Sequence, residues 1–190
     1  MSEAASAPQL RLAVIPVTPL EQNCAILFDD ATKIGVVTDP GGDAPRILEA
    51  LTSLGVTVEK ILITHGHFDH AGGAQPLKEA LERQYGRPVP IEGPHRDDQF
   101  LLERIPESAA RWGIGGLAAC VSDRFLEDGD EVRFGSVVAK AIHCPGHSPG
   151  SIVYFFADVG LAIVGDVIFA GSIGRTDLPR GDHATLMRSI

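Results

Sequence analysis

The sequence predicts an α/β (α+β) fold in which two layered β-sheets are covered by helices. Short apolar runs of strand length gather in two blocks, residues 10–64 and residues 132–164. Segments whose apolar residues recur at helical spacing lie within the first block, between the blocks and near the end of the chain. Strand-rich blocks with interspersed helices favour two sheets packed face to face, with the helices on their outer sides.

The first block begins with three expected strands. Residues 10–17 and 23–28 predict two strands joined by a bend that contains proline, and residues 34–38 predict a third strand. A helix is expected next, with Asp43 as its N-cap and Gly55 at its end. Pro45 would lie in the first turn, and apolar side chains follow at helical spacing at Ile47, Leu48, Leu51 and Leu54.

The middle of the chain mixes expected strands and helices. Residues 60–64 predict a buried strand, and residues 73–85 predict a helix that ends before a glycine. Residues 88–91 are expected to form a short strand, and residues 95–105 are expected to be helical. Residues 106–128 contain several glycines and are expected to form an irregular, flexible loop.

The second block predicts the strands of the second sheet. Each expected strand is a short run rich in β-branched and aromatic residues. The runs cover residues 132–134, 137–142, 152–156 and 161–164. A last helix is expected to begin near Asp182.

Composition limits the classes of protein to which the chain could belong. With 190 residues, 44% of them hydrophobic, the chain is expected to form one domain over residues 10–190, preceded by a flexible tail over residues 1–9. The tail lacks the features of a secretory signal, and no apolar run is long enough to predict a membrane span. The net charge of −9 argues against a nucleic-acid partner. Three cysteines are too few for a disulfide framework, which fits the cytoplasm.

Four metal-binding side chains gather in the six residues that follow the strand expected over residues 60–64. In extended backbone, side chains two positions apart point the same way, so His65 and His67 can bind one cation together. Asp69 and His70 come where the chain must turn toward the next helix, and they can face a second cation. Imidazole and carboxylate suit zinc and iron. The alternative interpretation is a chance cluster of histidines on a solvated loop.

Two later segments supply further candidate ligands. His147 lies in a turn bounded by prolines and glycines, which hold such turns rigid. Asp166 follows the buried strand expected over residues 161–164, where an unpaired carboxylate is costly unless a cation meets it. Taken alone, each residue also fits an ordinary turn or cap. Together with residues 65–70 they predict a metal centre assembled from separate loops.

These motifs resemble the metallo-β-lactamase superfamily. The matching elements are Thr64-His-x-His-x-Asp-His70, the Pro-Gly-His-Ser-Pro-Gly-Ser turn ending at Ser151, and Gly165-Asp166. The Asp-His pair is similar to that of the glyoxalase II-like, or hydroxyacylglutathione hydrolase-like, subfamily. The resemblance covers about residues 10–190 and implies an αββα sandwich with its metal site at one edge, between the sheets.

The resemblance implies a ligand set for two divalent metal ions, most often zinc, with iron and manganese as alternatives. It implies one ion held by His65, His67 and His147, a second held by Asp69 and His70, and Asp166 between them. The family's second ion usually has one more histidine, in a Gly-His-Gly-Pro segment that this sequence lacks. We therefore expect that a C-terminal strand and helix are truncated, which leaves the second site incomplete.

The resemblance implies hydrolysis of a small-molecule thioester of the hydroxyacylglutathione type. A water made reactive by the metal ions would attack the thioester carbonyl, and Asp69 would orient that water and accept its proton. Arg175 is a candidate to bind a substrate carboxylate through a forked pair of hydrogen bonds, although an ion pair with Asp177 is the alternative.

Two other functions remain open on sequence alone. Persulfide dioxygenases share the motif, and their resemblance would assign one iron ion to His65, His147 and Asp166, with open positions for oxygen and substrate. One iron per chain and oxygen uptake on glutathione persulfide would distinguish this reaction from hydrolysis. The second alternative is a non-catalytic metal-binding domain, which would take up metal without turning over any thioester.

Overall fold

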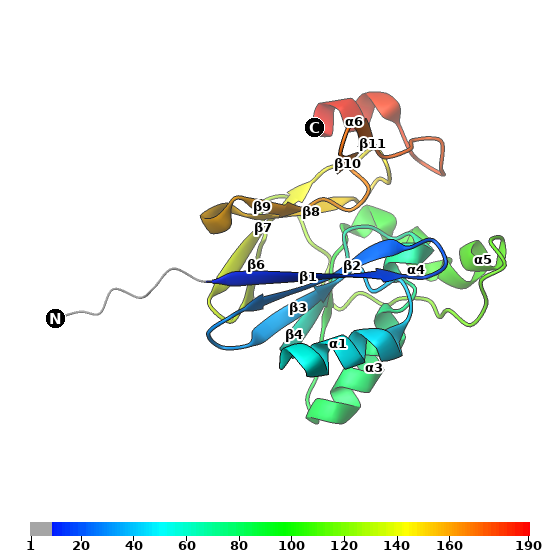
Figure 1. Ribbon diagram of the computed structural model, residues 1–190. Helices are drawn as coiled ribbons and strands as arrows, with labels where there is room; N and C mark the ends of the chain where they lie inside the picture. The colour runs from blue at the N-terminus through cyan, green and yellow to red at the C-terminus, as the bar shows by residue number, and fades with distance from the viewer. Residues whose placement is uncertain (1–8) are drawn as a thin grey trace.

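The computed structural model describes residues 9–190, and its fold is the expected arrangement of two sheets covered by helices (Figure 1). The tail expected over residues 1–9 lies outside the described residues, apart from Gln9. The first sheet has the strand order β1-β2-β3-β4-β5. Its strands are β1 (Leu10–Val17), β2 (Gln22–Asp29), β3 (Ile34–Thr38), β4 (Thr57–Leu62) and β5 (Ile91–Glu92).

The two sheets differ in strand direction. In the first, β1, β2 and β3 pair antiparallel, whereas β4 and β5 are parallel to their neighbours. The second sheet is antiparallel throughout, in the order β6-β7-β8-β9. Its strands are β6 (Glu131–Phe134), β7 (Val137–His143), β8 (Ile152–Phe156) and β9 (Leu161–Ile163), and the small hairpin β10 (Ile168–Phe169) and β11 (Ser172–Ile173) follows.

The helices lie on the outer sides of both sheets. The helices α1 (Ala44–Leu54) and α3 (Ala74–Tyr85) cover the first sheet, and α6 (His183–Ser189) lies near β10 and β11 on the side of the second (Figure 1). The shorter helical segments are α2 (Phe68–Ala71), η1 (Arg96–Asp98), α4 (Gln99–Glu103), α5 (Ile105–Ala110) and η2 (Ala157–Val159).

Strand β2 shows why two cores form. Side chains alternate between the two faces of a strand, and β2 is buried on both of them. Ile26 packs toward the helices with Leu51 of α1, whereas Leu27 packs between the sheets with Tyr154 of β8. A third cluster, which includes Val153 of β8 and Leu186 of α6, covers the outer face of the second sheet. The layers therefore follow the order helix, sheet, sheet, helix.

Several local expectations need correction. Asp43 precedes α1, but its side chain does not cap that helix; it accepts a hydrogen bond from the Thr18 N–H at 2.8 Å instead. The helix expected over residues 95–105 is broken into η1, α4 and the start of α5, because the chain bends at Asp98 and Arg104. The irregular segment expected over residues 106–128 begins with most of α5.

Two findings concern the chain as a whole. Among the described residues, no helix combines the length and the apolar character needed to cross a membrane. Cys24, Cys120 and Cys144 are free and buried, and burial raises the pKa of each thiol, to about 12 for Cys120. These thiols are therefore protonated, unreactive core residues near neutral pH.

Candidate metal centre

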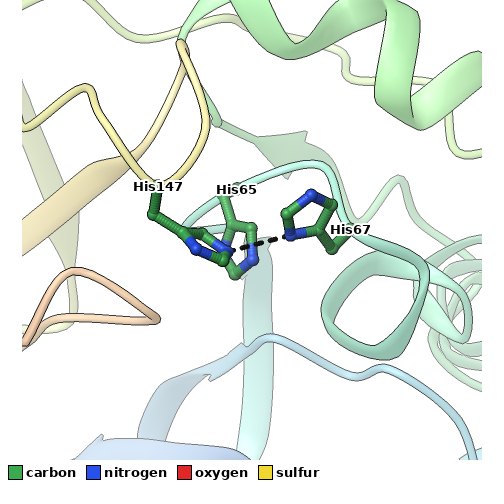
Figure 2. A group of neighbouring side chains, drawn as sticks. All are labelled: His65, His67 and His147. Atoms are coloured by element: carbon green, nitrogen blue, oxygen red, sulfur yellow. Dashed lines mark hydrogen bonds between the residues drawn. The ribbon is translucent and has the colours of Figure 1, made fainter. Parts of the chain in front are cut away.

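Loops at one edge of the sandwich bring the predicted ligands together. His65 and His67 lie on the loop that follows β4, and Asp69 and His70 lie in α2. His147 lies on the turn between β7 and β8, and Asp166 follows β9. Figure 2 shows the side chain of His147 meeting those of His65 and His67 from the opposite loop.

The three histidines of this group, the His65 trio, point their ring nitrogens toward a common centre. His67 Nδ1 lies 3.0 Å from His147 Nε2, and one nitrogen of each ring lies within 4.8 Å of the others (Figure 2). Two nitrogen ligands of a tetrahedral zinc ion are separated by about 3.4 Å. His65 Nε2 is buried and has no hydrogen-bond partner among the described residues. A buried, unpaired nitrogen facing two more nitrogens fits a bound divalent cation.

Hydrogen bonds on the far side of the rings orient two members of the trio, His65 and His147. His147 Nδ1 lies 2.8 Å from the backbone oxygen of Arg175, and His65 Nδ1 lies 3.0 Å from Thr64 Oγ1. The Arg175 oxygen can only accept, so His147 donates from Nδ1, and its Nε2 lone pair faces the centre. Such outer partners hold metal-binding histidines in one tautomer and one orientation.

His65 and His67 are uncharged near neutral pH. Burial, reinforced by the neighbouring imidazoles, lowers the pKa of His65 well below its usual value. Burial, with the positive charges that His147 and His70 would carry, lowers the pKa of His67 to about 3. Both rings therefore keep a nitrogen lone pair available at the pH where divalent metals bind proteins.

His70 lies in a different electrostatic environment. Its Nδ1 lies 3.0 Å from Asp39 Oδ2, and its Nε2 lies 3.3 Å from Asp166 Oδ1 and 3.8 Å from Asp69 Oδ2. Burial is the largest influence and lowers the pKa of His70, but the hydrogen bonds and charges of Asp166 and Asp39 together outweigh it. The pKa rises to about 10, so His70 is protonated when no cation is bound.

The pKa values of the two central carboxylates, Asp69 and Asp166, also shift in opposite directions. Burial raises the pKa of Asp69, and the positive charge of His70 only partly offsets this effect. Burial also raises the pKa of Asp166, but the hydrogen bond from His70 and the charges of the histidines outweigh it, and the pKa falls below its usual value. Asp166 Oδ2 lies 3.5 Å from His147 Nε2, so Asp166 faces both the trio and His70.

Two glycines allow the backbone to approach these carboxylate residues closely. A Cβ atom at Gly41 would lie 1.4 Å from the backbone oxygen of Asp69, and one at Gly174 would lie 1.7 Å from that of Asp166. Any side chain at either position would displace the loop behind a candidate ligand.

Sequence reasoning missed two buried aspartates that support the centre. Asp39 accepts hydrogen bonds from the Thr64 N–H at 2.7 Å and from Thr64 Oγ1 at 2.6 Å, in addition to its contact with His70. Asp39 also lies in a second group of possible ligands, with His65 and His70. The sequence could have identified Asp39, because its carboxylate comes directly after the strand expected over residues 34–38. The same kind of pattern identified Asp166.

Asp98 links the two loops that carry the trio. This fully buried carboxylate accepts hydrogen bonds from the Gly66 N–H at 2.8 Å, from Ser148 Oγ at 2.7 Å and from the Gly150 N–H at 2.6 Å. Gly66 lies between His65 and His67, and Ser148 follows His147. Asp98 therefore holds the two loops in register. Nothing local in the segment expected to be helical marked this residue.

Arg175, the sequence candidate for substrate binding, lies at the edge of the centre. Arg175 donates two hydrogen bonds of 2.7 Å to the carboxylate of Asp177, the ion pair that the sequence left as an alternative to substrate binding. His183 begins α6, is exposed and belongs to none of the possible ligand groups found among the described residues.

Two hollows of different chemistry open beside the centre. The larger, of about 500 Å³, lies toward β1, β2 and β9 and is lined by Glu21 and His70 among others. The smaller, of about 270 Å³, lies toward α2 and α5 and is lined by His67 and His147. Both reach Asp69 and Asp166. A small molecule could therefore approach the carboxylates from either side.

Comparisons with known proteins show what this chain is similar to. Residues 17–190 match the family model of the metallo-beta-lactamase superfamily. The chain is 39% identical to hydroxyacylglutathione hydrolase GloC of Haemophilus influenzae over 95% of this chain and 82% of that protein. It is 34% identical to the crystal structure of BLEG-1 B3 metallo-beta-lactamase, with a TM-score of 0.81 over 95% of this chain and 83% of that one. It is 32% identical to the crystal structure of TTHA1623 in a di-iron-bound form, with a TM-score of 0.81 over 93% of this chain and 83% of that one.

Proposed function

The chain belongs to the metallo-beta-lactamase superfamily and is a hydrolase, and on that premise we propose that it cleaves a thioester of the hydroxyacylglutathione type. The observation that supports this proposal most is the convergence of the His65 trio with Asp69, His70 and Asp166 at one edge of the sandwich. The similarity to a hydroxyacylglutathione hydrolase over most of both chains supports the choice of thioester.

We propose that the trio holds one divalent ion, that Asp69 and His70 hold a second, and that Asp166 contacts both. Zinc is the expected metal, and iron and manganese suit the same nitrogen and oxygen donors. When bound, such ions lower the pKa of water and polarise a carbonyl oxygen. The second site would open only when His70 gives up its proton, because its pKa of about 10 keeps it charged otherwise.

The chain's own residues would carry the proton and hold the geometry. Asp69 would accept the proton of the attacking water, and its raised pKa brings it closer to the range where a carboxylate is an effective base. The new C–O bond would form and the C–S bond would break, and the leaving thiolate would take the proton that Asp69 accepted from the water. Asp98 would keep the two histidine loops at a constant separation during this step.

The deciding experiment combines metal analysis with a substrate panel. The purified protein should contain up to two equivalents of divalent metal and should hydrolyse S-lactoylglutathione faster than a β-lactam or a phosphodiester. Removal of the metal by a chelator should abolish the activity, and zinc should restore it. A protein that carries metal but hydrolyses no thioester would refute this proposal and favour a non-catalytic metal-binding domain.

A second candidate function is oxidation of glutathione persulfide by one iron ion held by His65, His147 and Asp166. TTHA1623, the relative of 32% identity, was crystallised in a di-iron-bound form, which supports iron as a metal for this fold but not the number of ions. One equivalent of iron together with oxygen uptake on the persulfide would establish it in place of hydrolysis. We propose a reducing, cytoplasmic location for either activity, because the three cysteines are free and buried.

A further inference from the structure

The smaller hollow, which we call the α5 hollow, joins the centre to an apolar wall. Its inner side is formed by His67, His147 and the two central carboxylates. The apolar wall is formed by side chains that include Phe68, Leu101 and Trp112. Phe68 directly follows His67 in the sequence, so the apolar wall begins where the ligand loop ends. A molecule that enters this hollow would contact the candidate metal ligands and the apolar wall at once.

Trp112 is the unusual member of the apolar wall. It follows the end of α5, its side chain is 59% exposed, and its ring centre lies 6.3 Å from that of Phe68. A single exposed aromatic residue is ordinary on a protein surface, but this one borders a hollow that ends at the centre. Large, rigid aromatic side chains give contact area at little entropic cost, and binding sites favour them.

The charges that line the two hollows distinguish them. The α5 hollow contains two cations, Arg111 and Arg175. The larger hollow contains Glu21 and no lysine or arginine among its described lining residues. Arg111 and Arg175 already pair with Glu107 and Asp177, but a guanidinium has five N–H donors, so each pair leaves donors for a carboxylate. Of the two hollows, the α5 hollow is therefore the one whose described lining includes arginine, the side chain that binds a carboxylate through a forked pair of hydrogen bonds.

We propose that the α5 hollow is the binding site for the thiol portion of the substrate, and that the substrates are thioesters whose thiol carries a carboxylate. Arg111 would bind that carboxylate, and Trp112 would cover the neighbouring amide or apolar part of the thiol. The scissile carbonyl would then lie at the inner end of the hollow, beside His67 and Asp69. This assignment rests on the proposed thioester hydrolysis, and it specifies the side of the centre on which the substrate binds.

Intrinsic fluorescence tests this assignment, because Trp112 is the only tryptophan in the chain. The metal-loaded protein is titrated with S-hexylglutathione, a thioether that the enzyme cannot hydrolyse. We expect a saturable change in tryptophan emission and a dissociation constant raised about tenfold by Arg111→Gln, since a charge-assisted hydrogen bond is lost. Arg133→Gln is the matched control, because Arg133 forms an exposed ion pair with Glu131 on β6, away from the lining of the hollow.

Calorimetry and kinetics on Trp112→Ala complete the test. This variant removes the fluorescent probe, so binding of S-hexylglutathione is followed by heat, and we expect a weaker affinity and a higher KM with little change in kcat. Binding of the thioether without a change in Trp112 emission, or an unchanged KM in both variants, would overturn the assignment while leaving the thioesterase intact. Absence of thioester hydrolysis together with Arg111-dependent binding would instead refute the proposed reaction and retain the site.

Discussion

His67 and His70 lie three positions apart on one short segment, yet the protein shifts their pKa values in opposite directions. His70 is buried and His67 is half-buried, and burial by itself favours the neutral ring. His67 faces mainly other imidazoles, and its pKa falls to about 3. His70 lies between Asp39 and Asp166, and its pKa rises to about 10. The neighbours, not the residue type, decide whether a buried histidine is ready to bind a metal.

This difference in pKa divides the centre into two halves that differ in what must happen before a metal ion can bind. In the His65 trio, His65 and His67 are neutral before any cation arrives, and hydrogen bonds with Thr64 Oγ1 and with the backbone oxygen of Arg175 orient His65 and His147. The His70 half holds a proton that a cation must displace. We therefore expect the first equivalent of metal to bind with less pH dependence than the second.

Removal of a trio ligand should have the largest effect. His65→Ala should lose most of the bound metal and lower kcat/KM by more than about 100-fold, because even changes to outer partners of metal ligands cost 10- to 100-fold. The far-ultraviolet circular dichroism should stay unchanged, since the two cores do not include His65. His183→Ala, at the exposed start of α6, is the control. Full turnover in His65→Ala would show that the trio is not the centre.

Replacement of the link between the two trio loops should have the next largest effect. In Asp98→Asn, one buried oxygen that accepts hydrogen bonds from Gly66, Ser148 or Gly150 becomes an amide nitrogen that cannot accept. We expect metal affinity and kcat/KM to fall about 10- to 100-fold and the free energy of unfolding to fall by roughly 1–3 kcal/mol. Metal titration and chemical denaturation would measure both.

The neighbouring residue offers a matched control for this prediction. Asp97 carries the same charge one position earlier, and its side chain is exposed. Asp97→Asn should therefore leave both quantities nearly unchanged. Equal losses in the two variants would show that the net charge of this segment matters, and not the link that Asp98 forms.

Asp39→Asn should change how the stability of the metal-free protein depends on pH. Because the pKa of His70 is raised to about 10 in the folded state, its stabilising effect is complete below the unfolded value of about 6.5 and is lost as pH rises toward 10. The loss is at most about 5 kcal/mol, since a pKa difference of one corresponds to about 1.4 kcal/mol. Removal of the Asp39 charge should lower the pKa of His70 in the folded protein and so reduce this pH-dependent loss of stability.

Denaturation of the metal-free wild type and Asp39→Asn at a series of pH values from 6 to 10 would measure this effect. Asp158→Asn, which removes a negative charge from the exposed surface, is the control and should keep the wild-type dependence of stability on pH. Identical pH profiles in wild type and Asp39→Asn would contradict the role of Asp39 in keeping His70 protonated.

Loss of the Arg175 side chain should have the smallest effect. Its guanidinium pairs with Asp177 at the exposed rim, while its backbone oxygen, which holds His147, is retained in Arg175→Gln. We expect KM for an anionic thioester to rise about threefold, with kcat and metal content unchanged, because exposed ion pairs are weak. A large loss of metal in this variant would show that the side chain, and not only the backbone, positions the trio.

The strands and donor residues could be predicted because their signals are local. Residues 10–17 and 34–38 coincide with β1 and β3, and the crowded donors of residues 65–70 lie where the chain leaves β4. Asp98 could not be found in this way. Its hydrogen-bond partners lie 32 to 52 positions away along the chain, and its own segment looked like one continuous helix.

The sequence by itself determined which chemical groups this protein can offer to a cation, because these histidines and carboxylates lie directly after short apolar runs or in a turn marked by proline and glycine. Only the tertiary structure decided the state of each group. Asp39, from a distant segment, keeps the proton on His70, and the backbone oxygen of Arg175 sets which ring nitrogen of His147 faces the centre. Asp98, also distant along the chain, holds the two histidine loops together. The physical reason is that a pKa and an orientation depend on burial and on nearby charges, which arise only when the loops meet.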